Sequence, residues 1–532
     1  MTISLRNSFS VIALSAALMM GACGPKDKAG SPQISAEAAP LGLKAASDKD
    51  FARHFAVPER TTSEADANKA LALLGMAESG ATDLTWAARE GSNGNYTFTN
   101  LSSNTDDGVV MIETAVLTGV HMEGDAANFD RADFTGVSMT GDDLTVKVKN
   151  MTVARPTPDT AKAILKSIEK MSDSDDKLSL EMEDDDLDIG FGAISVADVT
   201  VSGDEVSGTI NQMVYGTDAQ TERTDFKVSD VNLTIQPRGQ SDASAPSLLT
   251  MKSLTGRGFL NASDQMDMAS GGLGALLGSL NMYEKPYDSF SLDSLIFNNS
   301  NVEMNIAGFE GEATTKGDVT TIRQVGKPMV FKLKEAPKAM EARQFYKTMS
   351  DLGFDNITIK SSQVSVLDEG KDTIRVNDGI LEMTDGFKLN YTYGASGLKE
   401  VQQAMNTGTS QTAQQRMAMQ MLKLNDMKIS LEDKSIVERG LKLAAEMRGA
   451  DPERVKKEMR AAVTMAPLLA RSDLEKDLAS ELGGAFMEFI EKGGTLTIEM
   501  APTEPLPMAD LMALQQNGGS LKDLGFTAEQ SD

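Results

Sequence analysis

An eight-residue pattern recurs along the chain and constrains its fold more than any other feature. It reads apolar, any, apolar, any, Asn/Asp/Ser, apolar, any, apolar. Alternation within each half is typical of a strand with one buried face. A weaker copy, YTFTNLSS (96–103), lacks the last apolar residue. The full copies are VKVKNMTV (146–153), ISVADVTV (194–201), FKVSDVNL (226–233), FSLDSLIF (290–297), LGFDNITI (352–359) and LKLNDMKI (422–429).

The two halves of each copy are out of phase by one residue. In an unbroken strand, this slip would turn the second apolar pair to the opposite face. A β-bulge at the fifth position would absorb one residue, and Asn and Asp tolerate the left-handed backbone that suits such a site. The alternative is that both faces are buried. The fifth positions are Asn150, Asp198, Asp230, Ser294, Asn356 and Asp426.

Four apolar side chains cannot offset the conformational entropy of a lone eight-residue strand, so the copies must share a sheet. Their spacing is too irregular for a solenoid of fixed period. We therefore expect an α+β, β-rich fold. Its core would be an extended, twisted, mainly antiparallel sheet of repeated strands, with several amphipathic helices and a helical insertion near the C-terminus.

Turn and helix signals lie between the repeats. Asp-Gly pairs at 107–108 and 385–386 predict β-hairpins. A helix over 160–171 would place Ala161, Ile164, Ile168 and Met171 on one face. Other helices are expected at 63–76, 337–349 and 398–421.

The C-terminal region predicts three helices followed by a strand. The first carries an apolar stripe and ends at Gly449. Asp451 and Pro452 begin the second, and Ser472-x-x-Glu475 is a capping box for the third. The alternating segment TLTIEM (495–500) then predicts a strand. The stripe consists of Val437, Leu441, Ala444 and Met447.

The first residues indicate secretion. Arg6 precedes an apolar run at 9–20, which is followed by small residues and by Cys23, the only cysteine. This is typical of a signal peptide, and the run is shorter than the ~20 apolar residues of a membrane-spanning helix. A plain signal peptide with an incidental cysteine is the alternative. Residues 24–40, rich in Gly, Pro, Ala, Lys and Ser, read as a flexible tether.

The segment Met20-Gly21-Ala22-Cys23 resembles the lipobox of bacterial lipoproteins. The resemblance implies that Cys23 becomes the N-terminus and carries a diacylglyceryl group and usually an N-acyl chain such as palmitate. Two acyl chains suffice for stable anchoring. Residue 24 is Gly rather than the Asp that retains many lipoproteins in the inner membrane. The implied location is the periplasmic face of the outer membrane.

These signals divide the chain into four parts. Residues 1–22 are the expected signal peptide, and 23–50 the lipidated N-terminus and tether. Residues 51–335 form an N-terminal β-rich region. Residues 336–532 form a C-terminal β-sheet region with a helical hairpin.

The last third resembles a group of proteobacterial envelope proteins akin to the YdgA-like family and, more remotely, to AsmA-like proteins. The resemblance is carried by LKLNDMKISLED, by the paired helices around GADPE and by GGTLTIEMAPTEPLPMADLM, over roughly residues 422–524. It implies a long, curved antiparallel sheet, in some relatives an open groove for lipid. It implies no catalytic residues.

Composition excludes several functions. A net charge of −27 repels nucleic acids and anionic membrane surfaces, so we expect no nucleic-acid partner. His54 and His121 are the only histidines, and we expect both to be packing or surface residues. No GxSxG elbow is present, and no zinc-ligand spacing. The sequence thus predicts no enzyme activity, no metal site and no cofactor.

Two further segments have features of binding sites. The acidic stretch 173–186 fails as an EF-hand because Lys177 and Leu178 occupy key positions. A solvated loop is favoured over weak calcium binding. GGLGALLGSL (271–280) is a buried loop or short helix, or alternatively a lid or membrane-touching tip. The four acidic residues considered as calcium ligands are Asp173, Asp175, Asp184 and Asp186.

The expected function is that of a non-enzymatic, lipid-anchored envelope protein that binds lipid or another hydrophobic ligand in a β-sheet groove. The 32 methionines suit an adaptable apolar surface, although they also serve as ordinary core filling. The alternative is a periplasmic scaffold whose sheet is covered by its own helices. A carboxylate-dependent hydrolase is a third option without a matching constellation. The sequence identifies no protein partner.

Overall fold

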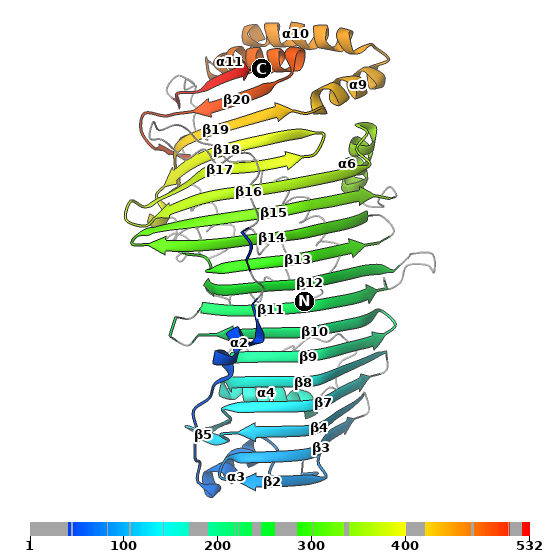
Figure 1. Cartoon of the computed structure of the whole chain (residues 1–532), viewed down its shortest axis with the longest axis vertical. Helices are drawn as coiled ribbons and strands as arrows, with labels where there is room; N and C mark the ends of the chain where they lie inside the picture. The colour runs from blue at the N-terminus through cyan, green and yellow to red at the C-terminus, as the bar shows by residue number, and fades with distance from the viewer. Residues whose placement is uncertain are drawn as a thin grey trace. The chain divides into compact units, whose positions relative to one another are not determined.

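The computed structural model describes residues 41–43, 46–81, 83–105, 108–141, 143–169, 190–218, 220–221, 223–236, 246–260, 285–299, 302–334, 340–400, 421–469, 473–508, 510 and 524–531. Two compact units emerge. The N-terminal unit contains Lys44–Gln265 and Phe290–Ser300, and the C-terminal unit contains Met266–Ser289, Asn301–Asp532 and residues 41–43. Both are built on antiparallel sheet (Figure 1). The expected β-rich α+β fold, with helices near the C-terminus, is confirmed.

In the N-terminal unit, almost every strand pairs with the strands before and after it in sequence. The order is β2–β3–β4–β7–β8–β9–β10–β11–β12, all antiparallel, and β1 also pairs with β3. The hairpin predicted between β3 and β4 is confirmed, although residues 106–107 lie outside the described residues. The bounds are β1 Leu84–Thr85, β2 Ala88–Ser92, β3 Asn95–Thr105, β4 Gly108–Thr118, β5 His121–Glu123, β6 Ala126–Asn128, β7 Arg131–Gly141, β8 Leu144–Pro156, β9 Phe191–Gly203, β10 Val206–Thr217, β11 Arg223–Ile235, β12 Ser247–Leu260 and β13 Ser289–Asn298.

One residue in each of the strands β3, β4 and β7 to β12 interrupts the alternation, and these residues lie in register across the sheet; β5 and β6 pair only with each other. We call this row the crease. Alternate strands have a left-handed residue there, with φ between 50° and 66°. Pairing has the same register on both sides, since Ile210 is opposite Val231 and Gln212 is opposite Ser229. The crease consists of Asn100, Glu113, Gly136, Lys149, Asp198, Asn211, Asp230 and Lys252.

The crease returns both apolar pairs of the repeats in β3, β8, β9 and β11 to one face, as the sequence predicted. Tyr96, Phe98 and Leu101, which lie on both sides of the crease in β3, belong to one buried cluster. This arrangement differs from the expected β-bulge, in which only one of two paired strands contains an additional residue. Here neighbouring strands each contain one, so the pairing register between them does not change. Asp198, Asp230 and Ser294 are left-handed as expected.

The expectation was wrong for Asn150 and for Asn356. In β8 the crease position is Lys149, one residue earlier, and Asn150 pairs with Thr135. At Asn356 the strand only begins, because a helix that ends at Asp351 precedes it, and Gly353, with a φ of 77°, follows that helix. The first half of that repeat is therefore a helix end rather than a strand.

Helices close the apolar face of this unit. Helix α3 (Glu64–Leu73) begins at Ser63, whose side chain accepts a hydrogen bond from the N–H of Asp66, and α4 spans Pro158–Glu169. Both match predicted helices and pack against the strands; Ala161 and Ile164 of α4 belong to the expected apolar face. The side chains of Ile168 and Met171 lie outside the described residues. The cluster is fully packed around Phe98, Leu101, Leu117, Ala70, Leu71 and Leu165.

The C-terminal unit repeats the same simple order, β14–β15–β16–β17–β18–β19–β20–β22, with β21 beside β19. True bulges occur here. Asn377 is an additional residue in β17 and Asn425 in β19, next to the predicted position Asp426. The β17–β18 hairpin is confirmed, with Asp385 left-handed at its turn. The bounds are β14 Val302–Lys316, β15 Val319–Leu333, β16 Asn356–Asp368, β17 Thr373–Met383, β18 Phe387–Ser396, β19 Lys423–Asp433, β20 Thr495–Met500, β21 Leu506–Pro507 and β22 Thr527–Ser531.

Four helices accompany these strands: α6 (Met340–Asp351), α9 (Ile436–Arg448), α10 (Pro452–Leu469) and α11 (Asp473–Lys492). Helix α6 confirms the prediction for 337–349, whereas that for 398–421 lies mostly outside the described residues. Gly449 ends α9, and the Asp451 carboxylate accepts the N–H of Arg454 at the start of α10. Ser472, the predicted cap of α11, is outside the described residues.

The predicted stripe of α9 is wrong at one position. Val437, Leu441 and Ala444 pack in a cluster, but Met447 is 80% exposed and Ala445 is buried instead. Met447 lies about 200° around the helix from Ala445, so it points away from the packed side.

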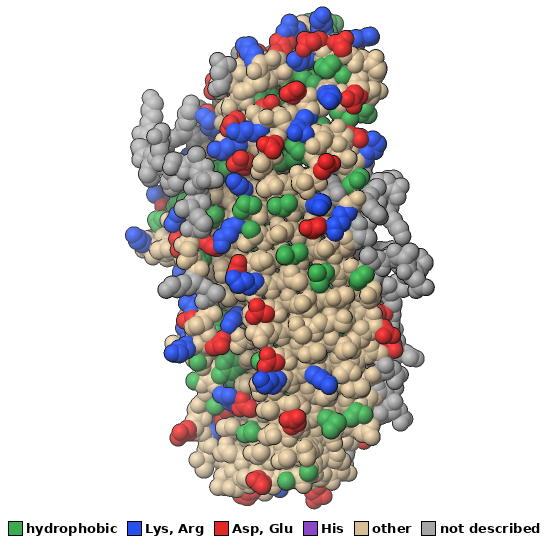
Figure 2. All heavy atoms as spheres, turned by 45° about the vertical axis from the view of Figure 1, so that its right-hand side comes forward, with side chains coloured by type: hydrophobic (Ala, Val, Ile, Leu, Met, Phe, Trp, Pro, Cys, Tyr) green, Lys and Arg blue, Asp and Glu red, His purple; other side chains and the backbone are tan. Residues whose placement is uncertain are grey.

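No helix among the described residues has the length and apolar composition needed to cross a membrane. On the face drawn in Figure 2, basic and acidic side chains are interspersed rather than gathered into a block of one sign.

Candidate functional site

The segment 46–56, which we call the N-terminal strap, packs on the sheet of the N-terminal unit. It contains helix α2 (Asp48–Phe51) and the 3-10 turn η1 (Ala52–Phe55). Ser47 and Asp50 form a reciprocal capping box that begins α2. Phe51 and Phe55 pack against Val214 of β10.

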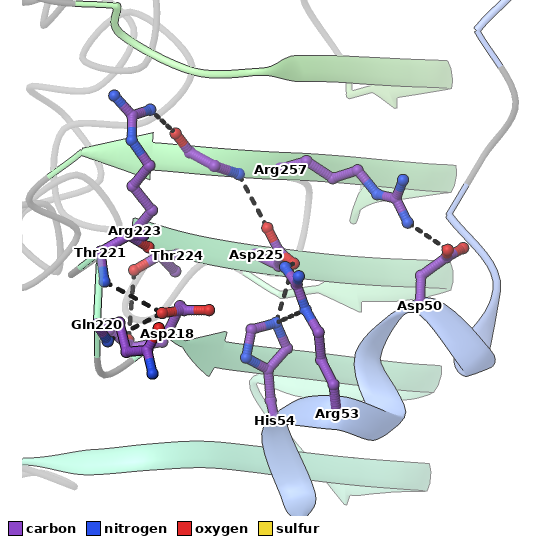
Figure 3. Close-up of polar contacts among 12 residues, drawn as sticks. Asp50, Arg53, His54, Asp218, Gln220, Thr221, Arg223, Thr224, Asp225 and Arg257 are labelled. Atoms are coloured by element: carbon purple, nitrogen blue, oxygen red, sulfur yellow. Dashed lines mark hydrogen bonds and ion pairs between the residues drawn. The ribbon is translucent and has the colours of Figure 1, made fainter.

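The Asp225 carboxylate fixes the strap beside these apolar contacts, through a buried contact with His54 and an ion pair with Arg53. His54 Nε2 lies 2.9 Å from Asp225 Oδ2, and Arg53 Nη2 lies 2.7 Å from the same oxygen (Figure 3). The side chain of His54 is 2% exposed and that of Asp225 6%. Gly216 is opposite Asp225 in β10, and a Cβ there would lie 2.5 Å from His54 Cγ. Glycine therefore makes room for the imidazole.

A bulge in β12 completes the site. Arg257 and Gly258 together stand opposite Asp225, and Gly258 has a φ of 61°. The N–H of Gly258 donates to Asp225 Oδ1 over 2.9 Å. The bulge lets Arg257 reach Asp50 of α2, at 2.5 Å, because a bulge re-aims a side chain.

Two more contacts hold the strap. Lys227 of β11 pairs with Asp48 at 2.8 Å. Arg155 Nη2 donates to the backbone oxygen of His54 at 3.0 Å. Polar contacts from strands β8, β11 and β12 thus converge on this short segment of chain.

The electrostatics keep Asp225 ionised. Burial opposes its charged form, but hydrogen bonds from His54, the Gly258 N–H and Arg53 outweigh burial and lower the pKa of Asp225 below its usual 3.8. A carboxylate that accepts two or three hydrogen bonds shows this behaviour.

This arrangement suits attachment rather than catalysis. Both oxygens of Asp225 are engaged by the strap and the bulge, and His54 is enclosed. Within the described ranges, no group of three or more His, Cys, Asp or Glu side chains is placed to hold a metal ion. His121 is likewise buried, with Nδ1 2.7 Å from the Gly119 oxygen.

The C-terminal unit offers a different candidate, an apolar face on strands β15 to β19. Register places its members on one side; Leu389, for example, pairs with Leu381 and with Leu431. The opposite side carries ion pairs such as Arg375–Asp426 and Lys428–Glu499. Five members of this face pack on other segments: Phe331, Ile359 and Phe387 beside Met349 of α6 and Ile436 of α9, Leu431 beside Phe489 of α11, and Met427 beside Leu524. The other members are Met329, Leu381, Leu389, Tyr391, Tyr393 and Ile429.

These side chains are only half-buried. In the N-terminal unit, by contrast, Phe98, Ile112 and Phe134 at comparable central positions are at most 2% exposed. Ile357 and Met383 of the same face are buried where helix α6 packs, so the surface that a ligand could cover lies around Leu381, Leu389 and Tyr391.

A polar row crosses the same face. Tyr391 Oη donates to Gln363 Oε1 at 2.9 Å, and Gln363 Nε2 donates to Ser365 Oγ at 2.7 Å. Gln324 Nε2 donates to Tyr287 Oη at 2.9 Å. Burial, with a contribution from Tyr393, raises the pKa of Tyr391 to about 12. An apolar surface with a few fixed polar groups is the usual character of a small-molecule site.

Several predicted site residues lie outside the described residues: Cys23 with its lipobox, the acidic stretch 173–186 and the segment 271–280. Sequence reasoning placed His54 among packing residues, and it is buried. Its partner Asp225 is 171 positions away, so no local motif signals the pair.

Comparison with known proteins adds one finding. A family model described as an uncharacterized protein matches residues 380–531, which cover β18 to β22 and helices α9 to α11. No curated protein matches the chain.

Proposed function

We propose that this protein is a non-enzymatic, lipid-anchored envelope protein that binds a lipid or a similar amphiphile on the apolar face of its C-terminal unit. The observation that carries the proposal is the half-buried state of that face at the centre of a wide sheet. The row of glutamine, serine and tyrosine side chains beside it suits the polar end of such a ligand. Attachment through Cys23 would keep the protein at a membrane, where such ligands are found.

A scaffold function is the second candidate. It is favoured by the N-terminal unit, whose apolar face is covered by helices α3 and α4. A core packed in this way would leave the outer surface of that unit to hold a protein partner.

Tryptophan quenching tests lipid binding. Leu389→Trp places an indole on the apolar face, and Asn390→Trp places one on the opposite face of the same strand. With the signal of Trp86 subtracted, brominated phospholipid should quench the indole introduced at position 389 and leave the one at position 390 bright. Equal quenching of the two introduced indoles, or no quenching of either, would refute lipid binding on this face. The scaffold function would then be the remaining candidate.

The anchor is tested separately. Cys23→Ser should move the protein from the membrane to the soluble fraction, while the wild type stays with the membrane. Unchanged partitioning would refute lipidation at Cys23 without affecting the test at Leu389.

A further inference from the structure

Helices α9 to α11 carry an unusual share of exposed apolar surface. Of the eight large apolar side chains that are exposed among the described residues, four lie on these helices. Leu468 is 75% and Met465 49% exposed, both near the end of α10. Met447 and Phe486 are the other two.

The outward side of α10 is a continuous row. Val455 and Met459 pack inward against α9 and α11. Residues three or four positions apart lie on one side of a helix. The exposed members of the row are Arg454, Lys457, Ala461, Met465 and Leu468. Its first turns are thus basic and its last turns apolar.

Over α9 and α10 the charge is opposite to that of the whole chain, whereas α11 contains six Asp or Glu and two Lys. Residues 436–469 contain seven Lys or Arg and five Asp or Glu, whereas the chain carries a net charge of −27. The last nine residues of α10, AAVTMAPLL, carry no charge at all. Glu458, the acidic residue beside the row, is engaged by Arg448 and Arg454.

We propose that the outward side of α10 docks on an anionic lipid surface. A helix with basic and exposed apolar residues is the usual form of an interfacial segment. The overall acidity opposes such contact only at a distance, because salt screens charges over about 8 Å at physiological ionic strength. Once the helix is at the surface, the basic residues would face lipid phosphates while Met465 and Leu468 enter the acyl boundary.

Vesicle co-sedimentation tests this inference, with the Cys23→Ser chain used throughout so that no acyl anchor contributes. The chain should bind vesicles of phosphatidylglycerol, and binding should weaken with added salt. Binding to vesicles of pure phosphatidylcholine should be at least tenfold weaker, since each basic residue near an anionic surface contributes roughly fivefold.

The matched variants are Lys457→Glu/Leu468→Ser on α10 and Lys69→Glu/Leu73→Ser on α3. Both pairs change one exposed lysine and one exposed leucine. The α10 pair should lose at least tenfold in affinity, and the α3 pair should bind as the parent chain does. Circular dichroism spectra identical to the parent would show that both remain folded.

Three outcomes would overturn the inference. These are an absence of binding to phosphatidylglycerol, equal loss in the two double variants, and equal affinity for the two kinds of vesicle. Light scattering that shows a dimer abolished only by the α10 pair would assign the face to a second copy of this chain instead. None of these results depends on quenching at position 389.

Discussion

Replacing Asp225 with asparagine should loosen the N-terminal strap from the sheet. The carboxylate accepts hydrogen bonds from His54, from Arg53 and from the Gly258 N–H. Asparagine can still accept the hydrogen bond from the Gly258 N–H, but it lacks the negative charge that faces His54 and Arg53. Arg53 is 63% exposed and stays hydrated, so the main loss is the bond to His54. A hydrogen bond to a charged group contributes roughly 1.5–3 kcal/mol, which is the expected fall in the free energy of strap opening.

Hydrogen exchange measures this opening locally. Since roughly 1.4 kcal/mol is a factor of ten, backbone amides of residues 47–56 should exchange roughly 10 to 150 times faster in Asp225→Asn. Asp293→Asn, which removes the exposed ion pair with Lys252, is the control and should leave the strap unchanged. Unaltered exchange of the strap in Asp225→Asn would refute the reasoning.

The effect should also depend on pH. The folded-state pKa of Asp225 is below its usual 3.8, so the ionised carboxylate stabilises the docked strap above that pH. This contribution is lost as the pH falls through the folded-state pKa. The exchange difference between wild type and variant should therefore narrow well below pH 3.8. If the difference in exchange rate stayed constant in strong acid, the effect of the substitution would be due to the shape of the side chain rather than to its charge.

Two further changes test the sheets. Asp230→Ala should destabilise the N-terminal unit by about 1 kcal/mol, because alanine disfavours the left-handed backbone, whereas Asp230→Gly should be close to neutral. Urea unfolding followed by the fluorescence of Trp86 would show this, and an alanine variant as stable as the glycine variant would contradict it. Tyr391→Phe should cost about 0.5–1.5 kcal/mol by removing the bond to Gln363. Burial raises the pKa of Tyr391 from 10.0 to about 12, so the free energy of unfolding of the wild type should fall above pH 10.0. That of Tyr391→Phe should fall less, as measured by denaturant titration at each pH. Equal losses in the two proteins would exclude Tyr391 as the cause.

The repeated strands and their single apolar face could be predicted from alternation, because period two is imposed by the pleat itself. Left-handed backbone at Asp198 and Asp230 could also be predicted, since few residue types tolerate it. The in-step crease could not, because register between strands is a property of neighbours rather than of one segment. Lys149, which occupies the crease in β8, is not left-handed and is of a residue type that any exposed strand position accepts, so its own sequence does not mark it.

The strap site could not be predicted for a related reason. His54, Asp225 and Gly258 meet only through sheet pairing and a bulge, and each is ordinary in its own segment. Met447 shows what helical periodicity leaves open. Periodicity locates the apolar side of a helix, but it does not determine how many residues of that side are covered by neighbouring segments. The burial of the apolar face of β15 to β19 depends on which other segments cover it, and the alternation within a strand does not determine that coverage.

The crease has a consequence for how this protein can vary in size. Its left-handed residues occur in every second strand, at Asn100, Gly136, Asp198 and Asp230. The structural module is therefore a hairpin of two strands rather than a single strand. Duplication or removal of one whole hairpin, such as β9 with β10, would preserve the alternation, whereas loss of one strand would set two equivalent strands side by side. Lengths in this architecture should accordingly change in steps of two strands.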